Sequence, residues 1–130
     1  MNIDDIYVRQ WIKNDFLKKQ FNKTKYNCYI VGYHLSCHIE DSINFNALIT
    51  NNFDIYKKYI EDTYQNEHSI NIYKNLLENF DINKMKKIEI KYNSLRKKYE
   101  VMDGVHRLCI LIFKKIVKDR IIPLEYLNII

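Results

Sequence analysis

The segment "DGVHR" (103–107) places a carboxylate, a glycine, an imidazole and a guanidinium close together in the chain. It lies where a strand-like run, "KYEVM" (98–102), changes to a helix-like run that begins at Val105. A helix N-terminus offers main-chain N–H groups without partners and a partial positive charge, which suits a phosphate. His106 and Arg107 would stand in the first turn, where cations oppose the helix dipole unless an anion lies nearby. The segment therefore predicts an anion-binding turn.

The aspartate and the glycine would each have a part in such a turn. Gly104 can adopt a positive φ and reverse the chain without a Cβ clash. Asp103 can accept hydrogen bonds from the free N–H groups, or point outward as a base or a partner for magnesium. In a purely structural interpretation Asp103 caps the helix, His106 packs and Arg107 meets a surface carboxylate. So short a pattern does not separate the two interpretations.

The elements that must position this turn are clearest in the last third of the chain. The segments "KIEIKY" (87–92) and "KYEVM" (98–102) alternate as strands do, and "NSLRK" between them is typical of a hairpin loop. Apolar spacing predicts a helix from Val105 to about Lys118. The segment "RIIPLEYLNI" (120–129) predicts a returning strand, in which Pro123 marks an edge or a strand start.

The first two thirds predict shorter elements. Asp4 or Asp5 would cap a helix that ends near Lys19. The segment "YNCYIVGYHL" (26–35) is rich in aromatic and β-branched residues and predicts a strand. Three further helices are predicted, each with a polar cap residue: Ser42, Asn52 and Ser69.

Length and composition indicate one domain over residues 1–130. The chain has 130 residues, of which 47% are hydrophobic and 28% charged, which is typical of a globular protein rather than a disordered one. The predicted elements give an α/β (α+β) fold, a small mixed sheet with helices and a helical N-terminal part. Neither a span of about 18 apolar residues nor a secretory signal is recognised, so we expect a cytoplasmic protein without membrane association.

The net charge of +5 is weak evidence for a nucleic-acid partner because it is not polarised. Residues 1–60 carry 8 basic and 6 acidic side chains, and residues 61–130 carry 13 and 10. The 11 tyrosines could stack on bases, but most fall at core spacing among Ile and Leu, which favours packing. A small-molecule partner is therefore preferred to a nucleic acid.

Two cysteines and two histidines lie close enough in the sequence to suggest a zinc site. They are Cys28, His34, Cys37 and His38. Their spacing is irregular for structural zinc, and half of them fall on the predicted strand. Buried thiols and ordinary histidines are the preferred interpretation for these residues and for Cys109.

The stretch "YEVMDGVHRLCIL" (99–111), followed by "IIPLEYL" (121–127), resembles the signature of the ParB/sulfiredoxin superfamily. In that superfamily a strand, a D-G-x-H-R-type turn and a helix precede an "IPV"-like strand. The upstream "IEIKYNSLRKKYEVMDG" (88–104) is similar to the hairpin whose second strand delivers the motif. The resemblance covers about residues 66–128, whereas residues 1–65 contain no recognised motif.

Free-serine kinases of this superfamily carry a D-G-H-H-R turn, the form most similar to residues 103–107. The resemblance implies that nucleotide phosphates, from ATP or ADP, lie against a set of four residues: Gly104, Val105, His106 and Arg107. Asp103 would then orient the acceptor hydroxyl or hold Mg²⁺, and His106 would help to neutralise developing charge. Sulfiredoxins have a catalytic cysteine directly before their His-Arg pair. Here that position is Val105, so thiol chemistry of that kind is not implied.

The same kinases hold a catalytic glutamate before the helix that precedes the hairpin. By this resemblance Glu67 is the candidate that accepts the hydroxyl proton, with His68 and Ser69 on the substrate side. The Glu-His order here reverses the His-Glu order that is usual in the family. Partition proteins of the ParB type instead bind a nucleotide through an Arg-rich turn and add a DNA-reading helix-turn-helix.

The resulting hypothesis is a small-molecule kinase that transfers a phosphoryl group from a nucleotide to serine or a similar small polar metabolite. The alternative is a ParB-like nucleotide- or DNA-binding module without turnover. A third interpretation is a degenerate domain that serves assembly.

Overall fold

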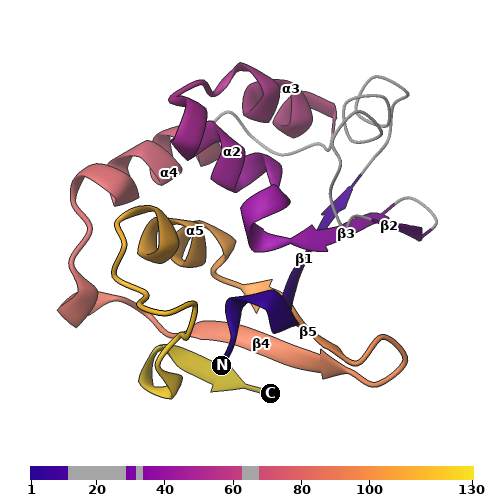
Figure 1. Ribbon diagram of the computed structural model, residues 1–130. Coiled ribbons are helices and arrows are strands. Elements are labelled where there is room, and N and C mark those ends of the chain that lie inside the picture. The colour runs from indigo at the N-terminus through magenta and orange to yellow at the C-terminus, as the bar shows by residue number, and fades with distance from the viewer. Residues whose placement is uncertain (12–28, 32–33, 63–67) are drawn as a thin grey trace.

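A mixed sheet forms the base of the molecule (Figure 1). The computed structural model describes residues 1–11, 29–31, 34–62 and 68–130. Within these residues a six-stranded sheet has the order β2-β3-β1-β5-β4-β6. The strands are β1 (Ile6–Trp11), β2 (Tyr29–Val31), β3 (His34–His38), β4 (Ile88–Asn93), β5 (Lys98–Asp103) and β6 (Leu127–Ile129). The sheet and the helices above it confirm the predicted mixed α/β fold.

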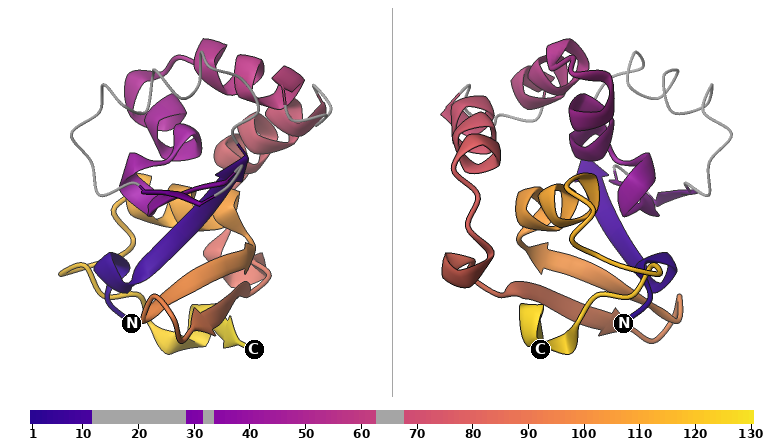
Figure 2. Two further views of the ribbon diagram at one scale, coloured as in Figure 1. Left: turned by 90° about the vertical axis from the view of Figure 1, so that its right-hand side faces the viewer. Right: turned by 60° about the vertical axis from the view of Figure 1, so that its left-hand side comes forward.

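The described helices lie together on one side of this sheet, with α5 next to β4 and β5 (Figure 2). They are α2 (Ile43–Thr50), α3 (Asp54–Asp62), α4 (His68–Glu78) and α5 (Val105–Phe113). Short 3-10 helices complete the chain: η1 (Ile3–Asp5), η2 (Ile39–Asp41), η3 (Ile82–Lys84) and η4 (Leu124–Tyr126). None of the described helices is both long and apolar enough to cross a membrane.

The N-terminus contains a strand where the sequence predicted a helix. The helix predicted from Asp4 or Asp5 is wrong over residues 6–11, which form β1, and residues 12–19 lie outside the described residues. In the run "IYVRQW" the most deeply buried side chains are Ile6, Val8 and Gln10, which are two residues apart, whereas Arg9 is exposed. This period of two, together with β-branched and aromatic residues, stabilises a strand rather than a helix.

The three helices predicted after the N-terminal strands are confirmed, but one of them begins before its predicted cap residue. The Asn52 side chain accepts a hydrogen bond from the N–H of Asp54 at 2.9 Å, next to the start of α3. Ser69 is not the residue before α4, because the helix already begins at His68. Serine is tolerated in a first helical turn, so its presence fixes a boundary only within one or two residues.

Ser42 is the best-defined cap of these helices. Ser42 is fully buried. Its hydroxyl accepts a hydrogen bond from the N–H of Phe45 at 3.1 Å and donates one to the carbonyl of Ile39 at 2.6 Å.

We expect Ser42→Ala to lower the free energy of unfolding by about 1–2 kcal/mol, measured by urea-induced unfolding. Thr50→Val at the exposed end of α2 is the control and should change it by less than about 0.5 kcal/mol. Equal stability of the two variants would contradict the capping role.

The end of the chain is less regular than predicted. The helix expected to reach Lys118 ends at Phe113, and Lys115 has a φ of +58°, which is incompatible with continued α-helix. The strand predicted over 120–129 shortens to β6, since the chain after Pro123 first forms η4. β6 is parallel to β4, and Leu127 pairs with Ile88.

The N-terminal and C-terminal parts of the chain share one sheet and one core. β1 lies between β3, to which it is antiparallel, and β5, to which it is parallel. Residues from both parts are fully buried together, among them Tyr56, Tyr73 and Leu108. The predicted packing of these tyrosines and the predicted burial of the Cys37 and Cys109 thiols are confirmed.

The pairing between β1 and β5 is short, and this creates the opening in which the site lies. It consists of Ile6 opposite Tyr99 and Tyr7 opposite Glu100. Beyond these pairs β1 continues to Trp11 and β5 to Asp103, so the two strands separate toward their carboxyl ends. In open α/β sheets, ligands bind outside the carboxyl ends of parallel strands. α5 begins at this point, directly after β5.

Candidate functional site

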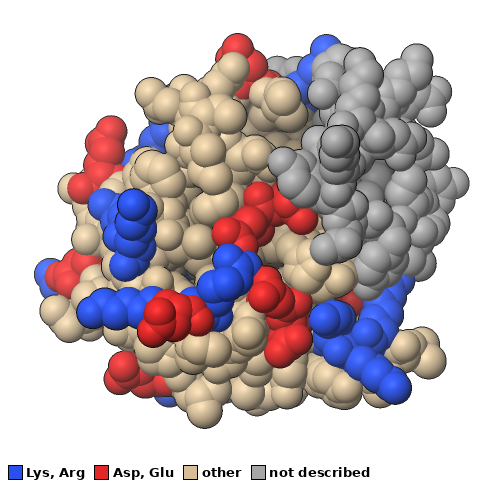
Figure 3. Space-filling model, in the orientation of Figure 1, with Lys and Arg blue, Asp and Glu red and all other residues tan. Residues whose placement is uncertain are grey.

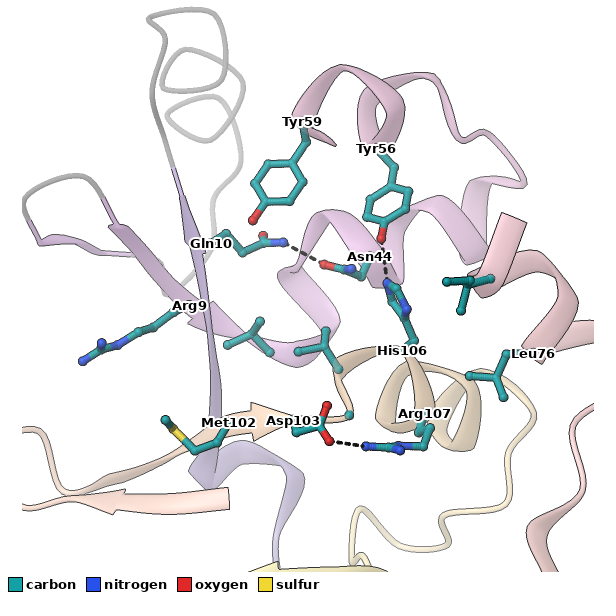
Figure 4. Close-up of a pocket in the computed structure, with 14 residues that line it drawn as sticks. Arg9, Gln10, Asn44, Tyr56, Tyr59, Leu76, Met102, Asp103, His106 and Arg107 are labelled. Carbon is teal, nitrogen blue, oxygen red and sulfur yellow. Dashed lines mark hydrogen bonds and ion pairs between the residues drawn. The ribbon is translucent and has the colours of Figure 1, made fainter. Parts of the chain in front are cut away.

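A cavity of ≈ 470 Å³ lies where β1 and β5 separate (Figure 4). It is lined from β1, α2, α3 and α4, and all of residues 103–107 border it. The structure therefore brings the whole predicted turn around one cavity. Part of the lining comes from the segment without a recognised motif, and it includes Gln10, Asn44 and Tyr56.

Gly104 makes the turn that joins β5 to α5. Its φ is +104° and its ψ is 25°, a left-handed conformation that favours glycine. A Cβ at this position would lie 2.7 Å from Nη2 and 3.0 Å from Nε of Arg107. Glycine is thus required both by the backbone and by the guanidinium that lies against it.

The first turn of α5 keeps its main-chain donors free. No side chain caps the helix, so of the two roles that the sequence left open for Asp103, capping is not the one observed. The first helical hydrogen bond runs from the N–H of Leu108 to the carbonyl of Gly104, at 2.9 Å. Among the described residues nothing accepts from the N–H groups of Val105, His106 and Arg107. These groups border the cavity and can bind an anion there.

Asp103 is held between two cations instead of capping the helix. Its Oδ2 atom lies 3.3 Å from Nη2 of Arg107 and 3.4 Å from Nζ of Lys86, and half of the side chain is exposed. Its slight burial raises the pKa, but the neighbouring Arg107 and Lys86 outweigh this and hold the pKa of the carboxyl below its usual value. Asp103 is therefore ionised at neutral pH.

The guanidinium of Arg107 has two buried nitrogen atoms without a hydrogen-bond partner among the described residues, which is unusual in a folded protein. Its side chain is only 15% exposed, and Nε and Nη2 are buried without a hydrogen-bond acceptor in the described part of the chain. The 3.3 Å contact with Asp103 is longer than a charge-assisted hydrogen bond, and its geometry does not form one. Buried donors left unpaired are costly, so such a group is best explained by a ligand that completes it.

His106 is packed and uncharged. Its Nε2 atom lies 2.6 Å from the Tyr56 hydroxyl, and its ring stacks on Tyr73, with the ring centroids 4.1 Å apart and an angle of 10° between the planes. Burial and the neighbouring Arg107 lower the pKa of His106 to about 4. The ring therefore does not supply the positive charge that the prediction gave it, although a neutral imidazole still donates a hydrogen bond. The purely structural interpretation, in which His106 packs against its neighbours, is confirmed for this residue.

Sequence reasoning missed the buried amides of the site. Gln10 is 1% exposed and Asn44 is 7% exposed, and the Nε2 atom of Gln10 donates to Oδ1 of Asn44 at 2.8 Å. The sequence does contain a sign that Gln10 is special, because it is a polar residue at a position of a strand that faces the core. A buried polar group at such a position requires a partner, which is how it could have been recognised.

The substrate side of the predicted site is not described. Glu67 lies outside the described residues, so its assignment as the catalytic base stays a prediction. His68 and Ser69 begin α4, and their side chains are not described either. The helix itself borders the cavity through Ile72 and Leu76.

The described residues do not form a metal site. No cluster of three or more His, Cys, Asp or Glu side chains suited to a metal occurs among them. Cys37 and His38 are consecutive in β3 and so point to opposite faces of the sheet, while Cys28 lies outside the described residues. Magnesium prefers one or two carboxylates without competing cations, whereas Asp103 already faces Lys86 and Arg107. These residues alone do not fit magnesium.

Surface charge gives no sign of a nucleic-acid interface on the face in Figure 3. Lys and Arg side chains there lie next to Asp and Glu side chains. Among the described residues, Arg120 is ion-paired in this way with Asp4 and Glu40. Binding to a phosphate backbone requires a continuous basic stripe or patch, which this face does not have.

Comparison of the chain with protein-family models, curated proteins and solved structures gives no match. The resemblance to the ParB/sulfiredoxin superfamily therefore depends on the motif over residues 99–127 and stays a prediction.

Proposed function

We propose that the chain binds the phosphate groups of a nucleotide at the start of α5 and transfers a phosphoryl group to a small hydroxyl compound such as serine. The observation that supports this most is the buried Arg107 guanidinium, whose Nε and Nη2 atoms have no acceptor beside the free N–H groups of the first turn. Main-chain donors and a guanidinium together are the usual means by which proteins hold phosphate oxygens. A cavity of ≈ 470 Å³ is within the range of small-molecule sites.

Phosphoryl transfer requires positioning and charge stabilisation more than covalent chemistry. Arg107 and the N–H groups of residues 105–107 would stabilise the charge on the transferred group. Asp103, ionised and exposed at the mouth of the cavity, would accept a hydrogen bond from the acceptor hydroxyl and so orient it. Neutral His106 would add a hydrogen-bond donor. Glu67 remains the base that the family resemblance suggests.

Nucleotide binding without turnover is the second candidate, and a specific observation favours it. Asp103 is ion-paired with Lys86 and Arg107, and its lowered pKa makes it a weak base. His106, with a pKa of about 4, is also a weak base at neutral pH. In this case the described part of the cavity binds a nucleotide but contains no group poised to accept a proton.

The experiment that tests the proposal measures nucleotide consumption with and without an added acceptor. Purified chain is first screened by thermal shift against ATP, ADP and inorganic phosphate. Consumption of the nucleotide is then measured with serine and with other small alcohols. ATP consumption that depends on the alcohol supports the kinase, and binding without consumption selects the second candidate. Absence of any stabilisation by phosphate-bearing ligands contradicts both.

We expect Asp103→Asn to lower the rate of phosphoryl transfer at least about 100-fold and to leave the melting temperature nearly unchanged, because Asp103 is exposed and caps no helix. Asp5→Asn is a matched control. Asp5 is also about half exposed and pairs with a lysine, Lys98, at 3.6 Å, but it does not border the cavity. A large loss of stability in Asp103→Asn alone would show that the residue is structural.

A further inference from the structure

A row of polar side chains runs from the main chain of α2 to His106, with one hydrogen bond between Gln10 and Asn44 and another between Tyr56 and His106 (Figure 4). It begins at Gln10, whose Oε1 atom lies 3.1 Å from the main-chain nitrogen of Ile43. A main-chain N–H can only donate, so the side-chain atom that faces it must be the carbonyl oxygen. The nitrogen of the same amide therefore points the other way, to Oδ1 of Asn44 at 2.8 Å. The orientation of the Gln10 amide is thus fixed by the backbone.

The orientation of the Gln10 amide in turn fixes the orientation of the Asn44 amide. Because its Oδ1 atom accepts from Gln10, the atom left on the side of Tyr56 is Nδ2, which can only donate a hydrogen bond. Tyr56 is 1% exposed, and burial raises the pKa of its phenol, so the hydroxyl keeps its proton. An amide nitrogen cannot accept this proton, and in the described part of the chain the acceptor within hydrogen-bond distance of the Tyr56 hydroxyl is Nε2 of His106, at 2.6 Å.

The direction of these bonds decides which nitrogen of His106 carries hydrogen. A neutral imidazole has one N–H, and the hydrogen bond made by one ring nitrogen determines the state of the other. Nε2 accepts from Tyr56, so Nδ1 carries the hydrogen. The titratable groups that face the ring are Tyr56 from α3, Tyr73 from α4 and Arg107 from α5 itself, and none of them offers a negative charge that would favour the imidazolium.

We propose that Gln10, Asn44 and Tyr56 are positioning residues that hold His106 as the neutral Nδ1–H tautomer, so that it adds a hydrogen-bond donor to the anion site over the whole neutral pH range. The hydrogen bond from His106 to a ligand rests on the proposed function, whereas the tautomer of His106 is independent of it. In this arrangement the first turn of α5 presents donors alone: three main-chain N–H groups, Arg107 and His106. A fully ionised phosphate, which has only acceptor atoms, matches such a set.

The direct test is long-range ¹H–¹⁵N NMR of the ¹⁵N-labelled full chain without ligand. We expect His106 to show hydrogen on Nδ1 and none on Nε2 from about pH 6 to pH 8, with no titration in this range. Hydrogen on Nε2 in the wild-type chain, or titration of His106 near pH 6.5, would overturn the proposal. This measurement requires no variant, so a variant that fails to fold does not weaken it.

Two substitutions test the positioning role. Tyr56→Phe removes the hydroxyl that donates to Nε2, and Asn44→Asp gives Tyr56 an acceptor in place of a donor. Both should move hydrogen to Nε2. Tyr73→Phe is the control, since the ring still stacks on His106 and only a hydroxyl that donates to the Asn44 carbonyl is lost. An unchanged tautomer in both test variants, or the same change in the control, would contradict the role.

ATP binding by these variants separates this inference from the proposed function. If the wild-type chain binds ATP, Tyr56→Phe should weaken binding about fivefold, the loss expected for one hydrogen bond, and Tyr73→Phe should not. Equal affinity of Tyr56→Phe and the wild type would show that His106 does not donate to the ligand. If the wild-type chain has the expected tautomer but does not bind ATP, the proposed function fails and the positioning role stands.

Discussion

Replacing Arg107 by methionine should weaken binding of ATP or ADP by about 10-fold to 100-fold, measured by calorimetric titration. One hydrogen bond to a charged group contributes about 1.5–3 kcal/mol, which corresponds to this range. One bond is counted because Nε has no acceptor among the described residues, whereas Nη2 already lies beside Asp103. Lysine would be a poor substitute as well, because it cannot present two parallel donors to a phosphate. Arg107→Lys should therefore recover only part of the affinity.

The same substitution should not destabilise the free chain. The wild-type protein buries two guanidinium nitrogens without acceptors, and this unfavourable burial disappears when methionine fills the space with an apolar side chain. We expect the free energy of unfolding to stay the same or to rise by up to about 1 kcal/mol. A site that binds more weakly while the fold becomes no less stable is characteristic of a functional residue.

Arg120→Met is the matched control. Arg120 is also an ion-paired arginine, with Asp4 and Glu40 as its partners, but it is half exposed and lies away from the cavity. Its loss should lower stability slightly and leave nucleotide affinity unchanged. Unaltered affinity in Arg107→Met, or an equal loss in both variants, would show that the orphaned guanidinium is not the anion-binding group.

Gly104→Ala should both destabilise the chain and remove nucleotide binding. A φ of +104° costs a residue with a Cβ about 1–2 kcal/mol, and the new Cβ would lie 2.7 Å from Nη2 of Arg107. The guanidinium must then move away from its position over the turn. We expect the free energy of unfolding to fall by about 2–3 kcal/mol, measured by urea-induced unfolding, and binding of ATP to become undetectable by thermal shift.

Repeating Gly104→Ala in a chain that already carries Arg107→Ala separates the backbone strain from the clash with the guanidinium. In Arg107→Ala the clash with the guanidinium is absent, so adding Gly104→Ala should cost only the backbone strain, about 1–2 kcal/mol. The coupling energy between the two substitutions then reports the contact between the glycine and the guanidinium. If Gly104→Ala costs the same in both backgrounds, Arg107 does not lie against the turn in solution.

The sequence by itself determined the features that depend on residues close together in the chain. The hairpin of β4 and β5, the glycine turn and the start of α5 could be predicted because alternation, turn chemistry and helical spacing are local signals. Their order along the chain also placed the donors of residues 105–107 at the carboxyl end of β5. The identity of Gly104 alone indicated a positive φ, since only glycine adopts that conformation without strain.

Local signals were insufficient where two structures compete for the same residues. The run from Ile6 to Trp11 forms a strand because it lies between β3 and β5, each of which offers hydrogen-bond partners that are far away in the sequence. Likewise the sequence left open whether Asp103 caps α5 or points outward, and in the structure it turns to Arg107 and Lys86. The N–H groups of the first turn were left free by that choice, which depends on where the two cations lie.

Only the tertiary structure decided the chemical state of the site. His106 carries no positive charge because Tyr56 and Tyr73, from two other helices, exclude water from its ring. The amides of Gln10 and Asn44 reach the same cavity from β1 and α2. Charge and hydrogen-bond direction depend on burial and on partners, and both are set by contacts between residues more than thirty positions apart. A local pattern contains the candidate residues but not their protonation.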